Sequence, residues 1–181
     1  MASLRGELLV AAPALVDPNF RRTVVLVTEH SEEGAMGLVL NRATEASVEE
    51  AAPELATLVE GEAVVHVGGP VQPHAVVVLA EFDDPAAAAH LVLDDVGFVP
   101  AGADLEALGT TTRRARVFAG YAGWGAGQLE SELDDEGWIR APARVDDLFA
   151  PDPDELWAAV LKRKGGRFAL LARMPLDPSL N

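Results

Sequence analysis

The run from Gly120 to Leu133 constrains the fold more than any other part of this sequence. It contains four glycines, at positions 120, 123, 125 and 127, and it follows an apolar segment at 117–119. Behind the glycines lies an acidic stretch with leucines four residues apart, Leu129 and Leu133. Glycine is needed where φ is positive or where the backbone approaches a neighbour closely. The run therefore predicts a strand, a glycine-rich turn and then a short helix.

Two interpretations of this run are open. If the helix begins near Gly127, its free N–H groups and positive dipole end face the loop and could receive an anion or a carbonyl group. Alternatively, Tyr121 and Trp124 fill the core under a tight turn. The run is neither a phosphate loop, because no Lys-Ser/Thr pair follows the glycines, nor a match to the dinucleotide-binding spacing.

Length and composition predict one globular domain. The chain has 181 residues, of which 49% are hydrophobic, which is long enough for a sizeable core. The absence of cysteine excludes disulfides and thiolate chemistry, and it permits a reducing compartment without proving one. No apolar run approaches the roughly 20 residues of a membrane helix, and we expect no membrane association.

The charge argues against nucleic acid as a direct partner. Fourteen basic and 29 acidic residues give a formal charge of −15, which repels phosphate backbones. The best basic groups, residues 113–116 and 162–164, hold three cations each. The second group also fits a helix C-terminus, where cations are expected without any ligand.

Apolar runs and turn residues place the expected elements. Strands are predicted at residues 8–12, 23–28, 36–40, 64–67, 75–79, 90–93, 97–100, 116–121 and 138–142. The last of these is predicted to be an edge strand because it contains Pro142. Unbroken apolar runs predict burial of both sheet faces, with helices packed over them. The strand pairs and helices together predict a single α/β domain with a mixed, largely antiparallel sheet, either open or curled toward a barrel.

Helix starts are also visible. Ser47 and Glu50 have capping-box spacing, and Asp152 to Glu155 offers an N-cap, a proline and an acidic residue in order. After the second start, Leu156/Val160 and Trp157/Leu161 form apolar pairs. A helix at 104–108 is expected to stop at Gly109. Residues 168–174 are predicted to be a helix or a strand, with an extended tail from Pro175.

The candidate site consists of three stretches that each end or follow a strand. Strand ends at one edge of a sheet are where ligand crevices form. We therefore predict that these stretches share one cleft. Glycine N–H groups, an aromatic wall, amide groups and one arginine would contact the ligand there. The alternative is that all three are separate structural turns. The candidate ligand-binding residues are Asn41, Arg42, Gly68, Gly69, Pro70, Val71, Gly120, Tyr121, Trp124, Gly127, Gln128 and Glu130.

Motifs of known chemistry are not found. The sequence has no Gly-x-Ser-x-Gly elbow and no His-Glu-x-x-His helix. His66 and His74 could face each other across a hairpin but lack a third ligand, so no metal is expected, and no cofactor is expected either. The acidic residues 130, 132, 134 and 135 are interpreted as a solvated helix face, with paired-carboxylate chemistry as the alternative.

The run 120–130 resembles the signature of the YqgE/AlgH family. Residues 6–11, 34–42, 68–71 and 177–181 match further family stretches in the same order. The resemblance implies one compact bacterial cytosolic α/β domain over residues 1–181, without an established biochemical activity. It leaves three hypotheses: a ligand- or partner-binding regulatory protein, an enzyme of unknown reaction that uses the glycine-rich loops, and a transcription-linked regulator. An unknown protein partner or a small ligand is expected in the first case.

Overall fold

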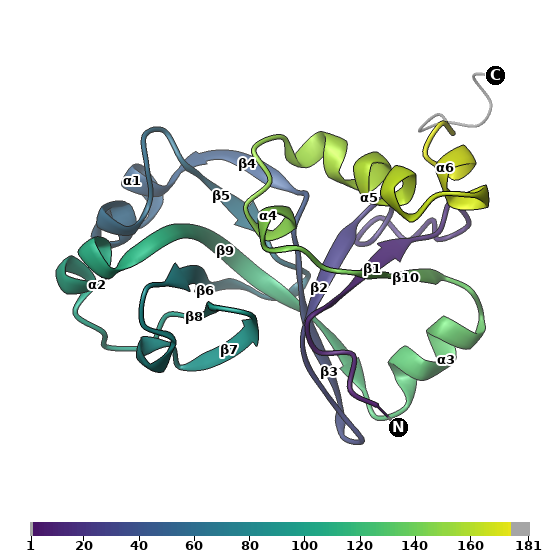
Figure 1. Ribbon diagram of the computed structural model, residues 1–181, viewed down its shortest axis with the longest axis horizontal. Helices are drawn as coiled ribbons and strands as arrows, with labels where there is room; N and C mark the ends of the chain where they lie inside the picture. Colours follow the sequence, from purple (N-terminus) through teal and green to yellow (C-terminus); the bar gives the residue numbers. More distant parts are fainter. Residues whose placement is uncertain (1, 175–181) are drawn as a thin grey trace.

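The computed structural model describes residues 2–174, which form one sheet covered by short helices (Figure 1). The tail from Pro175 lies outside these residues. The strands are β1 (Glu7–Ala11), β2 (Val24–Ser31), β3 (Gly34–Val39), β4 (Ala43–Ser47), β5 (Val64–Val67), β6 (Val71–Phe82), β7 (His90–Leu93), β8 (Val96–Phe98), β9 (Thr112–Gly125) and β10 (Trp138–Pro142). The helices are α1 (Val48–Ala51), α2 (Leu105–Thr111), α3 (Gln128–Asp134), α4 (Val145–Leu148), α5 (Leu156–Lys164), α6 (Arg167–Leu171) and the 3-10 turns η1 (Pro53–Leu58), η2 (Pro85–Ala87) and η3 (Pro153–Glu155).

The sheet is mixed, largely antiparallel and open. Its strand order is β10-β1-β2-β3-β9-β6-β8-β7, and β5 joins it by pairing with β4 and β9. The β5–β9 pair is parallel and the other pairs are antiparallel. The two end strands, β10 and β7, do not pair with each other, so the sheet is not closed into a barrel. The prediction of a mixed, largely antiparallel sheet is confirmed, and its barrel alternative is wrong.

Strand β9 crosses the whole molecule and joins its two halves (Figure 1). Its first part pairs with β6, and its last residues, 122–125, pair with β3. The predicted glycine-rich turn is therefore wrong in extent, because the chain stays extended through Gly125. The cause is tertiary: β3 supplies a partner for each of these glycine-rich residues. Helix α3 then begins directly after Gly127, as predicted.

Both faces of the β1–β2 half of the sheet are buried, as the unbroken apolar runs predicted. Leu8 and Val10 face a cluster formed with α4, α5 and α6, whereas Leu9 and Ala11 face a second cluster formed with α3. Side chains of a strand alternate between the faces, so an all-apolar strand needs a cover on each side. A third cluster lies beneath β6 and β9, where α1, η1 and α2 pack.

The helix signals are confirmed in part. Ser47 Oγ accepts a hydrogen bond of 3.1 Å from Glu50 N, as the capping box predicted. The apolar pairs of α5 are buried, and Trp157 also donates its indole N–H to Ala11 O at 2.9 Å. Gly109 does not stop α2 but lies inside it. A Cβ there would lie 2.9 Å from Thr57 O, so this glycine allows α2 and η1 to pack closely.

The predicted hairpin between His66 and His74 is wrong. Residue Phe118 of β9 pairs with His66 of β5 on one side and with Val77 of β6 on the other. Strand β9 therefore lies between the two histidine-bearing strands. The four-residue turn at 68–71 suggested a local hairpin, but the parallel β5–β9 pairing takes its place. Residues 168–174 contain helix α6 and no strand.

Candidate functional site

Two of the predicted site stretches meet directly through their backbones. Gly68 N donates to Ala119 O at 2.8 Å, and Gly68 O accepts from Val39 N at 2.8 Å. A Cβ on Gly69 would lie 2.1 Å from the carbonyl carbon of Tyr121. Gly120 approaches the same stretch from the other side, since a Cβ there would lie 2.4 Å from Gly69 O. The two backbone segments lie so close together that a side chain would not fit between them. These glycines are therefore required for packing.

Asn41 and Arg42 support a neighbouring loop. Asn41 Oδ1 accepts from Val24 N at 2.9 Å, and its Nδ2 donates to Arg22 O at 2.8 Å. The guanidinium of Arg42 donates to the carbonyl oxygens of residues 18, 19 and 21, at 2.7 to 3.2 Å. Both side chains therefore hold residues 18–24 in place. The hydrogen bonds of the Arg42 guanidinium go to backbone carbonyl oxygens of this loop.

Trp124 and Gln128 converge on Glu132. Glu132 Oε1 accepts from Trp124 Nε1 at 3.2 Å and from Trp138 Nε1 at 2.9 Å. Gln128 donates to Glu132 Oε2 at 3.0 Å and accepts from Gly125 N at 3.0 Å. This carboxylate fixes α3 to β9 and β10. The interpretation of Glu132 as part of a solvated face is wrong. The spacing of four residues between Gln128 and Glu132 on a predicted helix could have indicated that these two side chains meet.

Glu130 forms a close pair with His30. Its Oε1 lies 2.5 Å from His30 Nε2, and His30 Nδ1 accepts from Leu4 N at 3.0 Å. The hydrogen bond from His30 lowers the pKa of the Glu130 carboxyl. Both ring nitrogens of His30 are thus engaged, which leaves neither of them free for proton transfer to a substrate.

The contacts of the three predicted stretches support packing, and a cleft shared by them stays a prediction. Gly68 and Gly69 pack against Gly120 and Tyr121, and the side chains of residues 41 and 42 hold a loop. Gln128 and Glu130 lie on α3, and Trp124 packs beside that helix. Pro70 and Gly127 are exposed, and Val71 pairs with Tyr121. A ligand contact by any of these residues stays a prediction.

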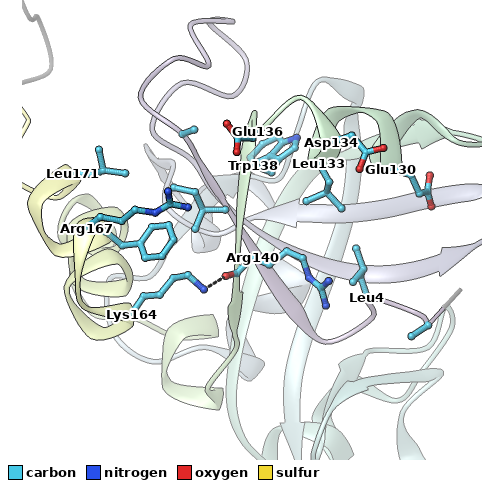
Figure 2. A pocket seen from close by; sticks show the side chains of 14 residues that line it. Leu4, Glu130, Leu133, Asp134, Glu136, Trp138, Arg140, Lys164, Arg167 and Leu171 are labelled. Atoms are coloured by element: carbon cyan, nitrogen blue, oxygen red, sulfur yellow. Dashed lines mark hydrogen bonds between the residues drawn. The ribbon is translucent and has the colours of Figure 1, made fainter.

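A groove of about 750 Å³ runs along β10, between α3 on one side and α5 and α6 on the other (Figure 2). Sequence reasoning did not find it, because its walls come from segments far apart in the chain. We call it the β10 groove. Its lining residues are Ala2, Leu4, Ala12, Glu130, Leu133, Asp134, Glu136, Trp138, Ile139, Arg140, Lys164, Arg167, Phe168 and Leu171.

The floor of the β10 groove is the free edge of a strand. Ala12 N donates to Gly137 O across the β1–β10 pair, and antiparallel bonding alternates along the strand. The N–H and C=O of Arg140 therefore point away from β1, toward the groove. Lys164 Nζ donates to Arg140 O at 2.7 Å (Figure 2). Pro142 lies at another outward position, so the ladder loses no bond there, and the edge-strand prediction is confirmed.

The two rims of the groove differ in charge. Glu130, Asp134 and Glu136 lie on the α3 side, whereas Lys164 and Arg167 lie on the opposite side (Figure 2). Between them, the walls are apolar, with Leu133 on one side and Phe168 and Leu171 on the other. A bound chain would thus find backbone groups on the floor, apolar walls and opposite charges at the two rims.

The AlgH-like family model matches residues 8–169. The chain belongs to this family. A UPF0301 protein of Thermobifida fusca is 43% identical, covering 99% of this chain and 96% of its own length. A UPF0301 protein of Streptomyces coelicolor is 42% identical, covering 100% and 97%.

Two solved structures show the same fold. The crystal structure of protein DIP2367 from Corynebacterium diphtheriae has a TM-score of 0.86 at 31% identity, covering 92% of this chain and 90% of its own. The solution structure of the AlgH protein from Pseudomonas aeruginosa has a TM-score of 0.72 at 34% identity, covering 96% and 95%. The resemblance drawn from the glycine-rich run is confirmed.

Two structural features are absent from residues 2–174. These residues contain no helix long and apolar enough to cross a membrane. They also contain no group of three or more histidine or acidic side chains placed to hold a metal ion.

Proposed function

We propose that this protein is a cytoplasmic regulatory binding protein that receives an extended segment of a partner protein in the β10 groove. The observation that carries the proposal is the outward-facing backbone of Arg140, at the floor of a groove between two helical walls. Strand addition to an exposed sheet edge is a recurrent mode of peptide recognition, in which main-chain bonds supply affinity and side pockets supply specificity.

The groove chemistry defines the partner segment. Successive side chains of an added strand alternate between the two walls. One set would contact Leu133 and Trp138 on the α3 side, and the other would contact Phe168 and Leu171. Charge complementarity favours basic residues beside Glu130, Asp134 and Glu136, and acidic residues beside Arg167. The segment would also displace the Lys164 ammonium from Arg140 O.

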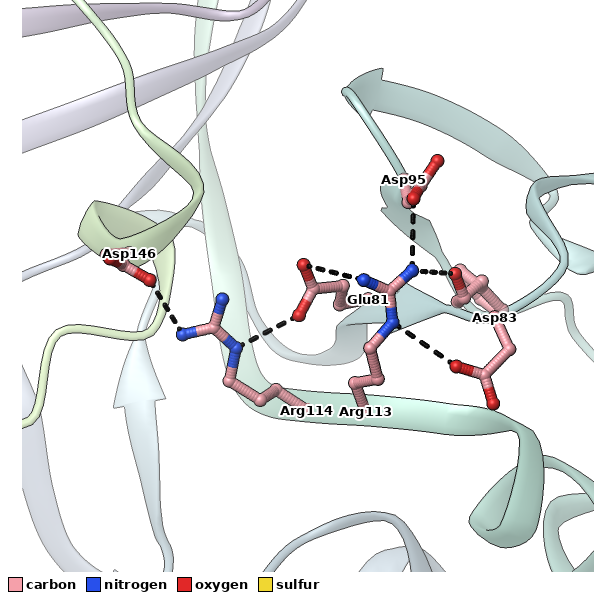
Figure 3. A network of polar contacts seen from close by, with 7 residues as sticks. Glu81, Asp83, Asp95, Arg113, Arg114 and Asp146 are labelled. Atoms are coloured by element: carbon pink, nitrogen blue, oxygen red, sulfur yellow. Dashed lines mark hydrogen bonds and ion pairs between the residues drawn. The ribbon is translucent and has the colours of Figure 1, made fainter.

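Direct binding to DNA remains disfavoured. The basic group at 113–116 was the best candidate for phosphate contacts, but Arg113 and Arg114 are paired with carboxylates (Figure 3). Pairing neutralises the local positive potential that phosphate attraction needs. A regulatory effect on transcription would then pass through a protein partner.

A pair of substitutions at one position tests the proposal. Display of random 12-residue peptides on phage would select ligands against the wild-type protein, and affinities would be measured by calorimetry. Arg140→Pro removes the outward N–H but none of the bonds to β1, whereas Arg140→Ala keeps that N–H and removes the ion pair with Glu7. We expect selected peptides to lose at least about tenfold in affinity with the proline variant and less than about threefold with the alanine variant.

Hydrogen exchange gives an independent readout. The amide of Arg140 is expected to exchange fast in the free protein and to be protected in the peptide complex. Equal affinities for both Arg140 variants, or protection only at other strands, would show that the partner does not add to this edge.

A further inference from the structure

Strand β9 carries three arginines close together, and two of them are fully paired. Arg113 contacts Glu81, Asp83 and Asp95 at 3.0 to 3.6 Å (Figure 3). Arg114 contacts Glu81 at 3.1 Å and Asp146 at 3.0 Å. The hydrogen bond that Arg113 donates to Asp95, together with the neighbouring carboxylates, raises the pKa of the Arg113 guanidinium. These two cations need no further partner.

Arg116 lacks such a partner. Its Nη2 donates to Ala150 O at 2.9 Å, but its Nη1 is buried without a hydrogen-bond partner among residues 2–174. No carboxylate within the described part of the chain forms an ion pair with it, and burial lowers the pKa of its guanidinium. Removing a charged group from water without a partner is costly, so the unpartnered Nη1 of this half-buried guanidinium points to an anion that comes from outside the chain.

His66 presents a second unpartnered nitrogen nearby. The residue is 4% exposed, and its Nδ1 lies 3.2 Å from Val64 O, so Nδ1 carries the proton. Its Nε2 is then an acceptor, and it is buried without a donor. Burial, and next the positive charge of Arg116, lower the pKa of His66 to about 4, so the imidazole is neutral at physiological pH.

Both side chains line one cavity of about 550 Å³. It lies between β5, β9, the η1–α2 pair and the segment at 149–153. Much of its wall is apolar, formed by Leu58, Val59, Val64, Phe149, Pro151 and Pro153. Glu60 and Glu62 also line it and are exposed. Arg113 and Arg114 line it too, with their guanidinium groups held by carboxylates. The cavity thus combines apolar walls and paired charges with one cationic donor, Arg116 Nη1, and one neutral acceptor, His66 Nε2, that have no partner among residues 2–174.

We propose that this cavity binds a small monocarboxylic acid with an apolar body and a hydroxyl group. Its carboxylate accepts from Arg116 Nη1, and its hydroxyl donates to His66 Nε2. The apolar body packs against Phe149 and the prolines of the 149–153 segment. The net charge of −15 disfavours ligands with several negative charges, such as nucleoside triphosphates. This site is separate from the β10 groove and does not depend on it.

Three probes distinguish the chemical requirements. Mandelate carries an aromatic body, a carboxylate and a hydroxyl, phenylacetate lacks the hydroxyl, and inorganic phosphate lacks the apolar body. Binding would be followed by the ¹⁵N shift of the His66 imidazole and by calorimetry. We expect mandelate to bind at least fivefold more tightly than phenylacetate, and phosphate to bind more weakly than either.

Matched variants locate the site. Arg116→Met should reduce mandelate affinity at least tenfold, and His66→Phe should remove the preference for mandelate over phenylacetate. Arg140→Met makes the same charge change outside this cavity, at a guanidinium paired with Glu7, and should change affinity less than twofold. Thermal unfolding of each variant verifies that it is folded.

The proposal is overturned by several results. These are no binding of mandelate up to 50 mM to the folded wild type, equal affinity in Arg116→Met and wild type, or tighter binding of phosphate than of mandelate. Peptide binding in the β10 groove should be the same for wild type and Arg116→Met, so failure of one site is distinguishable from failure of the other.

Discussion

Trp124 and Trp138 donate their indole N–H groups to the same oxygen atom of Glu132. Their rings pack edge to face with centroids 6.2 Å apart, although their strands, β9 and β10, are separated by three others in the sheet. One carboxylate therefore satisfies two largely buried indoles and anchors α3. The glycine-rich family run acts here as a structural junction between the sheet and this helix.

Removal of this carboxylate should destabilise the fold. Glu132→Ala leaves both indole N–H groups without an acceptor, so we expect the free energy of unfolding to fall by about 2–4 kcal/mol. Glu132→Gln keeps one acceptor oxygen for the indoles and should cost less. Asp134→Ala, at an exposed position of the same helix, should change stability by less than about 0.5 kcal/mol. Urea unfolding monitored by tryptophan fluorescence measures all three, and equal effects of Glu132→Ala and Asp134→Ala would refute this role.

The Glu130–His30 pair should make stability depend on pH in the acid range. The hydrogen bond from His30 lowers the pKa of Glu130 below its usual 4.5, so the folded state binds the proton less readily than the unfolded state. The resulting stabilisation is complete at pH values above the unfolded-state pKa, and it is lost as the pH falls through the folded-state pKa. The stability difference between wild type and Glu130→Gln should therefore shrink as the pH is lowered from 5.5 to about 3.5.

Glu136→Gln is the control for this pH dependence, because Glu136 is exposed and lines the same groove. Its stability difference from wild type should stay nearly constant over the same range. Urea titrations at each pH provide the measurement. A Glu130→Gln difference that grows on acidification would contradict the assigned pairing.

Gly69 should tolerate no side chain. A Cβ at this position would lie 2.1 Å from the backbone of Tyr121, and φ is +155°. Gly69→Ala should lower the free energy of unfolding by more than about 3 kcal/mol or prevent folding. Gly61 also has positive φ, +58°, but a Cβ there meets nothing within 4 Å. Gly61→Ala should thus cost only about 1 kcal/mol. Similar melting temperatures for the two variants would exclude the close packing of 68–69 against 120–121.

The same substitution should lower stability at Arg113 but not at Arg116. Arg116→Met replaces a half-buried cation that has no ion-pair partner among residues 2–174 by an apolar side chain, so stability without ligand should stay the same or rise by about 1 kcal/mol. Arg113→Met breaks an exposed, solvent-screened ion-pair network and should lower stability slightly. Urea unfolding without added ligand compares them. A loss of stability in Arg116→Met larger than in Arg113→Met would show that Arg116 is a structural cation.

The sequence by itself determined the elements that depend on local pattern. The period of apolar residues located most strands, Ser47 marked a helix start, and Pro142 marked an edge strand, because each of these depends on backbone bonding within a few residues. The unbroken apolar runs of β1 and β2 likewise indicated that both faces are covered. The order of short motifs was enough to indicate the family.

Only the tertiary structure decided which polar groups have partners. Arg113, Arg114 and Arg116 look alike in the sequence, yet two of them contact carboxylates from distant segments, whereas Arg116 Nη1 has no partner among residues 2–174. Three other features likewise join positions that are far apart in the chain. They are the parallel pairing of β5 with β9, the hydrogen bonds of the Glu132 side chain to two indoles, and the β10 groove. Partner choice depends on three-dimensional proximity and desolvation, and neither quantity is encoded in the spacing of residues along a single segment.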